Sequence, residues 1–180
     1  MKSRTITWEE PGGAAAEGLA MTGLEYLRAM ADGRLPGPPI GATMGMMPGG
    51  FETGRAVFFA DPGEYHYNPI GTVHGGLAAT LLDSAMSCAV HTTLAAGDRY
   101  TTLELKVNFV RPIAVETGRV RAGVYVAVAA AAQQSAVSNT QPTGGTGMLE
   151  DACPFRSSAR RKGRGHHVRR WADAGRRATE

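Results

Sequence analysis

The residues best suited to chemistry lie between positions 68 and 83. Asn68, His74, Gly75 and Gly76 belong to a polar, glycine-bearing turn that leads into an apolar segment containing Asp83 as its only charged residue up to Val90. If that segment is a helix, its first N–H groups lack intrahelical acceptors, and glycine lets a ligand approach the backbone. Singly, the glycines indicate a tight turn and the aspartate a buried acid. Together they favour an oxyanion-binding turn with a carboxylate beyond it.

The spacing of these residues resembles that of one enzyme family. His74 lies six positions after Asn68, Gly75 and Gly76 follow directly, and Asp83 lies nine positions after His74. This pattern is similar to that of the hotdog-fold acyl-CoA thioesterases of the phenylacetate-degradation type. The resemblance covers roughly residues 18 to 123.

The resemblance implies hydrolysis of an acyl-CoA substrate to a free acid and CoA, without a metal ion or other cofactor. In this family the backbone N–H of Gly75 would polarise the thioester carbonyl, and Asn68 and His74 would help to orient substrate and water. Asp83 would act as general base or as nucleophile, and the sequence leaves both routes open.

Three further positions complete the expected site. By the same resemblance, Thr102 would hold the attacking water, with Thr101 as the near alternative. Gly76 would belong to the substrate-binding turn. Arg111, which follows an expected strand and precedes a proline, could meet a phosphate of CoA or be a solvated strand end.

Helix geometry constrains how these groups can meet. Asp83 lies eight residues after Gly75, which places it about 12 Å along the axis of one continuous helix. A carboxylate cannot reach across that gap to a carbonyl held at its own helix start. We therefore expect Gly75 of one subunit to face Asp83 of another, with two equivalent sites in an isologous homodimer. The resemblance implies such a dimer, and often a homotetramer.

Periodicity predicts the elements that position these residues. Helical spacing of apolar residues predicts a short helix over 19–30 and a long helix over 75–95 that is apolar on more than one face. The loop over 36–50, rich in Pro, Gly and Met, could line an apolar cleft or pack under it. The expected fold class is α+β, a hotdog fold with an antiparallel sheet wrapped around a long central helix. Strands are predicted over 55–60, 103–109 and 120–128.

Domain organisation follows from composition. Residues 1–17 are expected to be a flexible N-terminal arm, 18–128 the hotdog domain, and 129–180 an atypical, low-complexity basic tail that is disordered. The last two strands of the family are predicted to be missing or replaced in this tail. Either a genuine extension or a shift of reading frame near residues 124–135 would explain it.

Charge and cysteine content exclude several function classes. Residues 1–150 carry 10 Lys+Arg and 13 Asp+Glu, whereas residues 151–180 carry 9 and 3. The basic character belongs to the tail, so no nucleic-acid partner is expected for the folded part. No apolar run or leader indicates a membrane span or secretion, which makes cytoplasmic localisation the expectation. Cys88 and Cys153 are expected to be free thiols, and neither His66–His91 nor His166–His167 has the spacing of a metal site.

Two other functions are alternatives to thioester hydrolysis. A non-catalytic, inactive hotdog-fold binding protein is the main alternative, because of the altered C-terminus. A hotdog-fold dehydratase or hydratase is less favoured, because those enzymes do not need the spacing from Asn68 through His74 to Asp83.

Overall fold

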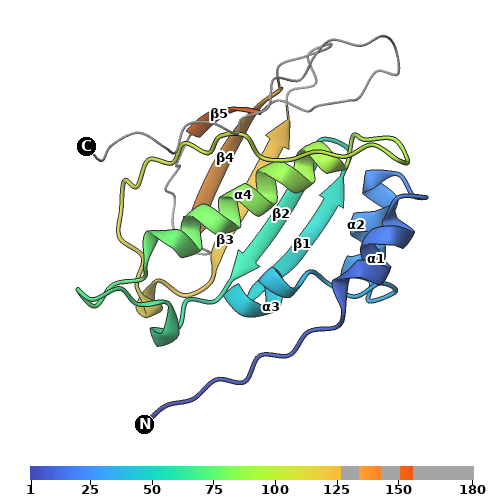
Figure 1. Cartoon of the computed structure of the whole chain (residues 1–180). Coiled ribbons are helices and arrows are strands. Elements are labelled where there is room, and N and C mark those ends of the chain that lie inside the picture. The colour runs from blue at the N-terminus through green and yellow to red at the C-terminus, as the bar shows by residue number, and fades with distance from the viewer. Residues whose placement is uncertain (127–133, 143–150, 156–180) are drawn as a thin grey trace, which may run out of the picture.

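An antiparallel β-sheet packed against one long helix forms the body of the protein (Figure 1). The computed structural model describes residues 1–126, 134–142 and 151–155. The strand order in the sheet is β1-β2-β3-β4-β5, and every neighbouring pair is antiparallel. The expected α+β architecture is therefore confirmed. The strands are β1 (Met46–Glu52), β2 (Arg55–Ala60), β3 (Val120–Val126), β4 (Gln134–Pro142) and β5 (Asp151–Phe155).

Four α-helices and two short 3₁₀ helices accompany this sheet in the described residues. None of these helices has the length and apolar content needed to span a bilayer. They are α1 (Pro11–Gly18), α2 (Gly23–Ala31), α3 (Pro39–Met44), α4 (Gly75–His91), η1 (Glu64–His66) and η2 (Val115–Thr117).

Helix α4 forms the centre of the core and confirms the predicted long helix. It packs against β2, β3 and β4, and Ala85, Ala89 and Val90 are fully buried. Small alanine side chains let the sheet approach the helix closely, so the apolar surface is removed from water along most of its length. The helix ends at His91, four residues earlier than predicted. There the Thr92 hydroxyl donates to the carbonyl of Ala89 and accepts the Gly54 N–H of the β1–β2 turn.

Strand β1 and helix α3 occupy the segment that the sequence predicted to be a loop. Pro48 and two glycines weaken the strand signal. The structure accommodates them with an irregularity in the β1–β2 register between Pro48 and Gly50. A Cβ at Gly49 would lie 2.5 Å from the ring of Phe59, so glycine fits at this irregularity in the pairing. This strand forms because its backbone pairs with β2, although its residues have low strand propensity.

The segment over 101–110 does not form the predicted strand. It belongs to no strand of the sheet in the described ranges. Leu105 and Val107 pack partly against the core, while Leu103 and Phe109 are exposed. The alternation is therefore real, but a strand also needs a hydrogen-bonded neighbour. The segment instead runs back antiparallel to α4, from its C-terminal end towards its start (Figure 1).

Strands β4 and β5 lie in the segment where the last two strands of the family were predicted to be missing or replaced. Residues 134–142 pair with β3 in continuous register from Val120↔Pro142 to Val126↔Ala136, and residues 151–155 pair with β4. The ladder is made by backbone groups, so it does not require an apolar alternation in the sequence. The parts of the expected tail at 129–133, 143–150 and 156–180 lie outside the described residues.

The N-terminal segment contains a helix that the sequence did not predict. In α1, Pro11 occupies the first turn and the Glu10 carboxylate accepts the N–H groups of Gly12 and Gly13. This cap satisfies donors that a helix start leaves unpaired. The apolar period is too weak to reveal such a short helix. The flexible arm expected over residues 1–17 stays a prediction, and α1 forms its C-terminal part.

Helix α2 docks its first residue onto the end of α4. Gly23 donates its N–H to the carbonyl of Leu94, and a Cβ built at Gly23 would lie 1.8 Å from the carbonyl oxygen of His91. Thr22 and Glu25 form a capping box that fixes the helix start at this contact. The close approach of two backbones therefore requires glycine at residue 23.

We expect Gly23→Ala to destabilise the protein by about 1–3 kcal/mol, because the added methyl group forces two backbone segments apart. Gly13→Ala is the matched control, since it lies in α1 with no atom within 4 Å of the added Cβ, and it should be neutral or slightly stabilising. Denaturant unfolding of the two variants checks this. Equal midpoints would contradict the described docking of α2 on α4.

Candidate active site

Asn68 holds the loop that leads to α4. Its Oδ1 atom accepts the N–H groups of Ile70 and Thr72, and its Nδ2 atom donates to the Thr72 hydroxyl at 2.9 Å. The backbone closes the same loop, because the Asn68 N–H donates to the Thr72 carbonyl at 2.8 Å. The side chain is thus engaged within its own turn, which leads to the start of α4.

His74 is the N-cap of α4. Its Nδ1 atom accepts the Gly76 N–H at 2.8 Å, which leaves the proton of the neutral ring on Nε2. A Cβ at Gly76 would lie 2.8 Å from that same Nδ1 atom. Glycine at residue 76 therefore allows the imidazole to fold back over the helix start.

Gly75 is the first residue of α4, so its N–H has no intrahelical acceptor. A Cβ there would lie 3.1 Å from the ring of Phe109, which comes from the segment that runs antiparallel to the helix. Together with His74 and Arg111, these residues line a cavity of about 350 Å³. The helix start thus offers an available backbone donor beside one arginine.

Asp83 lies two turns further along α4 and is half-buried. The Thr102 hydroxyl donates to its Oδ1 atom at 2.8 Å, and the Ser87 hydroxyl lies 3.1 Å from the same Thr102 oxygen. Because Thr102 has only one proton and gives it to the carboxylate, Ser87 must donate to Thr102. The result is a directed chain from Ser87 to Thr102 to Asp83. Thr101 lines the same cavity, but Thr102 makes the contact.

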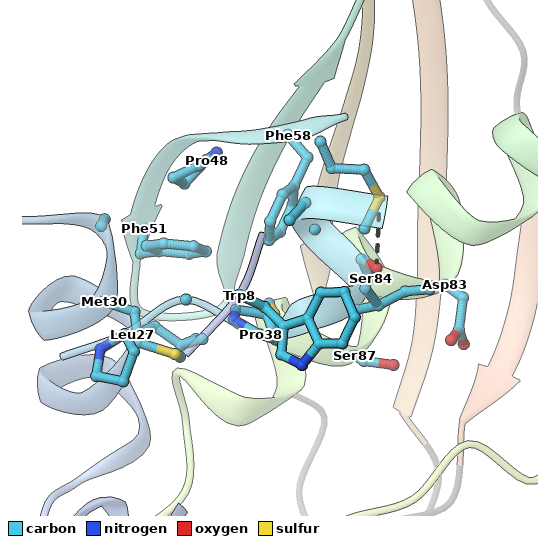
Figure 2. A pocket seen from close by; sticks show the side chains of 18 of the residues that line it. Trp8, Leu27, Met30, Pro38, Pro48, Phe51, Phe58, Asp83, Ser84 and Ser87 are labelled. Carbon is cyan, nitrogen blue, oxygen red and sulfur yellow. Dashed lines mark hydrogen bonds between the residues drawn. The ribbon is translucent and has the colours of Figure 1, made fainter. Parts of the chain in front are cut away.

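A large apolar cavity opens beside Asp83 (Figure 2). Its volume is about 780 Å³, and the carboxylate of Asp83 lies at one side of it with Ser84 and Ser87. Of the two roles considered for the loop over 36–50, lining an apolar cleft is the one observed. The apolar part of the wall includes Trp8, Leu27, Met30, Pro38, Pro48, Phe51 and Phe58.

The groups around Asp83 are held in their protonated forms. Burial and the charge of Asp83 raise the pKa of the Cys88 thiol to about 12. Burial, together with nearby acidic groups that include Cys88 and Asp83, also raises the pKa of Tyr100 well above its usual range. Both residues line the cavity. The carboxylate is therefore surrounded by neutral hydroxyl and thiol groups near pH 7.

The two halves of the predicted site lie in different cavities of one subunit. Asp83 and Thr102 line the larger cavity, whereas His74, Gly75 and Arg111 line the smaller one. Along α4 the halves are about 12 Å apart. The antiparallel segment contributes to both, with Thr102 at one end and Phe109 and Arg111 at the other.

The remaining histidines and cysteines have structural surroundings. His66 is buried, with its Nδ1 atom accepting the Gly63 N–H and its Nε2 atom 3.1 Å from the Met44 carbonyl, and burial lowers its pKa. His91 packs between the rings of Tyr26 and Tyr100, and burial likewise lowers its pKa. Within the described ranges no group of three or more potential ligands could hold a metal ion. The side chain of Cys153 and both residues of the 166–167 pair fall outside those ranges.

Comparison with known proteins relates the candidate site to one family. Residues 70–129 match the family model of the Thioesterase superfamily. This match contains the His74-Gly-Gly turn, α4 with Asp83, and Thr102. The site therefore lies in a segment that matches the thioesterase superfamily. The resemblance stated from the sequence is confirmed, and the superfamily supports thioester hydrolysis as the class of activity.

Several solved structures share the fold of this chain. A phenylacetic acid degradation-related protein from Ralstonia eutropha JMP134 aligns with a TM-score of 0.63 at 23% identity, covering 73% of this chain and 98% of that one. The E. coli PaaI protein from the phenylacetic acid degradation operon aligns with a TM-score of 0.58 at 18% identity, covering 77% and 92%. Zebra fish thioesterase superfamily member 2 aligns with a TM-score of 0.58 at 16% identity, covering 74% and 96%. A search of curated proteins gave no match.

Sequence reasoning missed several residues of the site. Ser87 lies one helical turn after Asp83, so the i, i+4 spacing could have placed it on the same face. Phe109 gave no signal, because its position over Gly75 depends on how the segment packs on α4. Trp8 was assigned to a flexible arm, yet it lines the cavity with Asp83.

Proposed function

We propose that this protein hydrolyses acyl-CoA thioesters to a carboxylic acid and free CoA. The observation that carries the proposal is the hydrogen-bonded carboxylate of Asp83 at the side of a large apolar cavity. An apolar cavity suits an acyl group, and the carboxylate supplies the one charged group that a reaction at the carbonyl needs. The superfamily match supports the same class of reaction.

The carboxylate could act in either of two ways. As general base, Asp83 would take a proton from a water that attacks the carbonyl carbon, and the C–S bond would then break to release CoA. As nucleophile, it would form a mixed anhydride, which water would later hydrolyse. In both routes the Thr102 hydroxyl donates to Oδ1 and so orients the carboxylate, which keeps further acceptor capacity for water or substrate.

The start of α4 would stabilise the negative charge that develops on the carbonyl oxygen. The Gly75 N–H has no intrahelical acceptor, and the helix dipole favours negative charge at this end. His74 keeps its ring proton on Nε2 and could donate it to the substrate or water. Arg111 lines the same cavity and would meet a phosphate of CoA.

A complete site would then require two subunits. The separation of Gly75 and Asp83 on one rigid helix prevents a single chain from placing both at one carbonyl. We propose an isologous homodimer, alone or within a homotetramer, in which the helix start of one subunit meets Asp83 of its partner.

Replacing Asp83 with Asn should lower kcat by about 10²–10⁴-fold, because the charge is lost while the size is kept. Asp98→Asn, an exposed acid on the loop after α4, is the matched control and should retain wild-type turnover. The assay is CoA release detected with a thiol reagent, with dimer size checked by light scattering. Near-normal turnover in a folded Asp83→Asn variant would rule out this role. Absence of turnover in the wild-type protein would favour a non-catalytic binding protein.

The role of the Gly75 N–H can be tested without disturbing the helix. Proline is well tolerated in the first turn, and His74 already has the extended φ −62° and ψ 134° that a following proline requires. Gly75→Pro removes the N–H and should lower kcat by about 10²–10³-fold. Gly75→Ala adds a similar contact with Phe109 but keeps the N–H, so it should lose much less. Equal losses in the two variants would show that crowding, not the donor, matters.

Mixing inactive subunits tests the shared site. In a heterodimer of Asp83→Asn with Gly75→Pro, one site carries both changes and the other carries neither. Statistical exchange at equal amounts should therefore restore roughly a quarter of wild-type activity. Native mass spectrometry measures the heterodimer fraction in the same sample. No recovery at a proven heterodimer fraction of one half would place the whole site in one subunit.

A further inference from the structure

Part of the cavity beside Asp83 is built by the N-terminal segment. Thr7, Trp8 and Glu9 line it together with residues of α2, α3, β1, β2 and α4. Figure 2 shows the indole of Trp8 near Pro38 on the same cavity as Ser87 and Asp83, with Phe51, Leu27 and Met30 at another part of the wall. The largest side chain that faces this cavity therefore comes from outside the helix and sheet that hold the carboxylate.

The segment is attached to the protein on both sides of Trp8. Before it, the Arg4 guanidinium donates to the carbonyls of Ala42 and Thr43 at 2.9 Å each, and it lies 4.1 Å from the centre of the Tyr65 ring. After it, Glu10 caps helix α1. Two carbonyls and an aromatic face hold a planar guanidinium better than a lysine would be held. The position of Trp8 is thus set by contacts along the chain on either side.

Trp8 lines the cavity and is also an exposed residue. The residue is 63% exposed, so the indole has one part on the cavity and another in water. A flat aromatic side chain in this position separates an apolar interior from solvent. If it were removed, an acyl chain lying in that part of the cavity would face water.

We propose that Trp8 is a specificity-determining residue that forms the solvent-side wall of the acyl pocket, and that Arg4 holds it there. The inference rests on the proposed function for its reaction, and it adds which part of the chain selects the acyl group. Short acyl groups would occupy only the end near Asp83. Longer acyl groups would extend along the cavity and gain from contact with the indole.

The first test measures kcat/KM for a series of straight-chain acyl-CoA thioesters from acetyl to decanoyl. Each methylene that is buried should raise kcat/KM by about fourfold. Trp8→Ala should leave acetyl-CoA within about twofold of wild type and lower the value for octanoyl-CoA by about tenfold, or roughly two lost methylene contacts. Trp8→Phe should lie between. Tyr125→Ala is the matched control, because Tyr125 is 60% exposed and is not among the residues that line the cavity.

The second test concerns the attachment. Arg4→Ala removes both carbonyl contacts and the ring contact, so it should reproduce the chain-length dependence of Trp8→Ala. Lys2→Ala is the control, because its ion pair with Glu64 is exposed and such pairs contribute little. A uniform loss over all acyl lengths in Trp8→Ala, or wild-type behaviour in it, would overturn the proposal.

A binding measurement separates this inference from the proposed reaction. The chain has two tryptophans, so Trp171→Phe leaves Trp8 as the only indole. S-octyl-CoA, a thioether that cannot be hydrolysed, should shift the Trp8 emission to the blue, whereas CoA alone should not. If the wild-type protein hydrolyses no thioester but this shift occurs, the proposed reaction is wrong, whereas the assignment of Trp8 to the wall of the acyl pocket is supported. No binding of S-octyl-CoA by calorimetry, or binding without a change in emission, would overturn the assignment of Trp8.

Discussion

The packing of α4 against the sheet is the interaction on which the other features depend. Its alanines are fully buried at residues 85 and 89, which lets β2 and β3 lie close to the helix and removes most of its surface from water. A carboxylate in the middle of such a helix is costly unless it is hydrogen-bonded. Thr102 satisfies Asp83, and Ser87 orients Thr102. The fold therefore tolerates one charge in its centre because a neighbouring segment supplies the partner.

The rigidity of the same helix keeps the two halves of the candidate site apart within one subunit. Because each residue adds a fixed rise, Gly75 and Asp83 stay about 12 Å apart whatever else moves. The segment over 101–112 runs along α4 and places Thr102 at the carboxylate and Phe109 at the helix start. Both halves are thus preorganised in one subunit, yet they face different cavities. Under the proposed function, dimer formation brings the helix start of one subunit to the Asp83 carboxylate of the other, and both are already preorganised in the single subunit.

The sequence predicted what side-chain patterns determine and missed what the backbone determines. The apolar period of α4 and the alternation of β3 were strong enough to predict both elements, and the spacing from Asn68 to Asp83 indicated the family. Strand β1 was not predicted, because Pro48 and the glycines of this strand have low strand propensity. Its pairing with β2 is nevertheless regular on either side of the irregularity. Strand β4 was not predicted, because a β-ladder can form without apolar alternation in the sequence. The place of Trp8 in the cavity wall was not predicted, because no local sequence pattern indicates which cavity a distant residue lines.

The surroundings of Asp83 also bear on which group can attack a thioester. Cys88 lines the same cavity and is the better intrinsic nucleophile, but only as a thiolate. A pKa of about 12 leaves roughly one thiol in 10⁵ ionised at pH 7. The charge of Asp83 contributes to that shift, so the carboxylate disfavours the Cys88 thiolate that would compete with it as a nucleophile. Under the proposed function, the arrangement therefore favours attack by the carboxylate, or by a water that the carboxylate activates, over attack by the thiol.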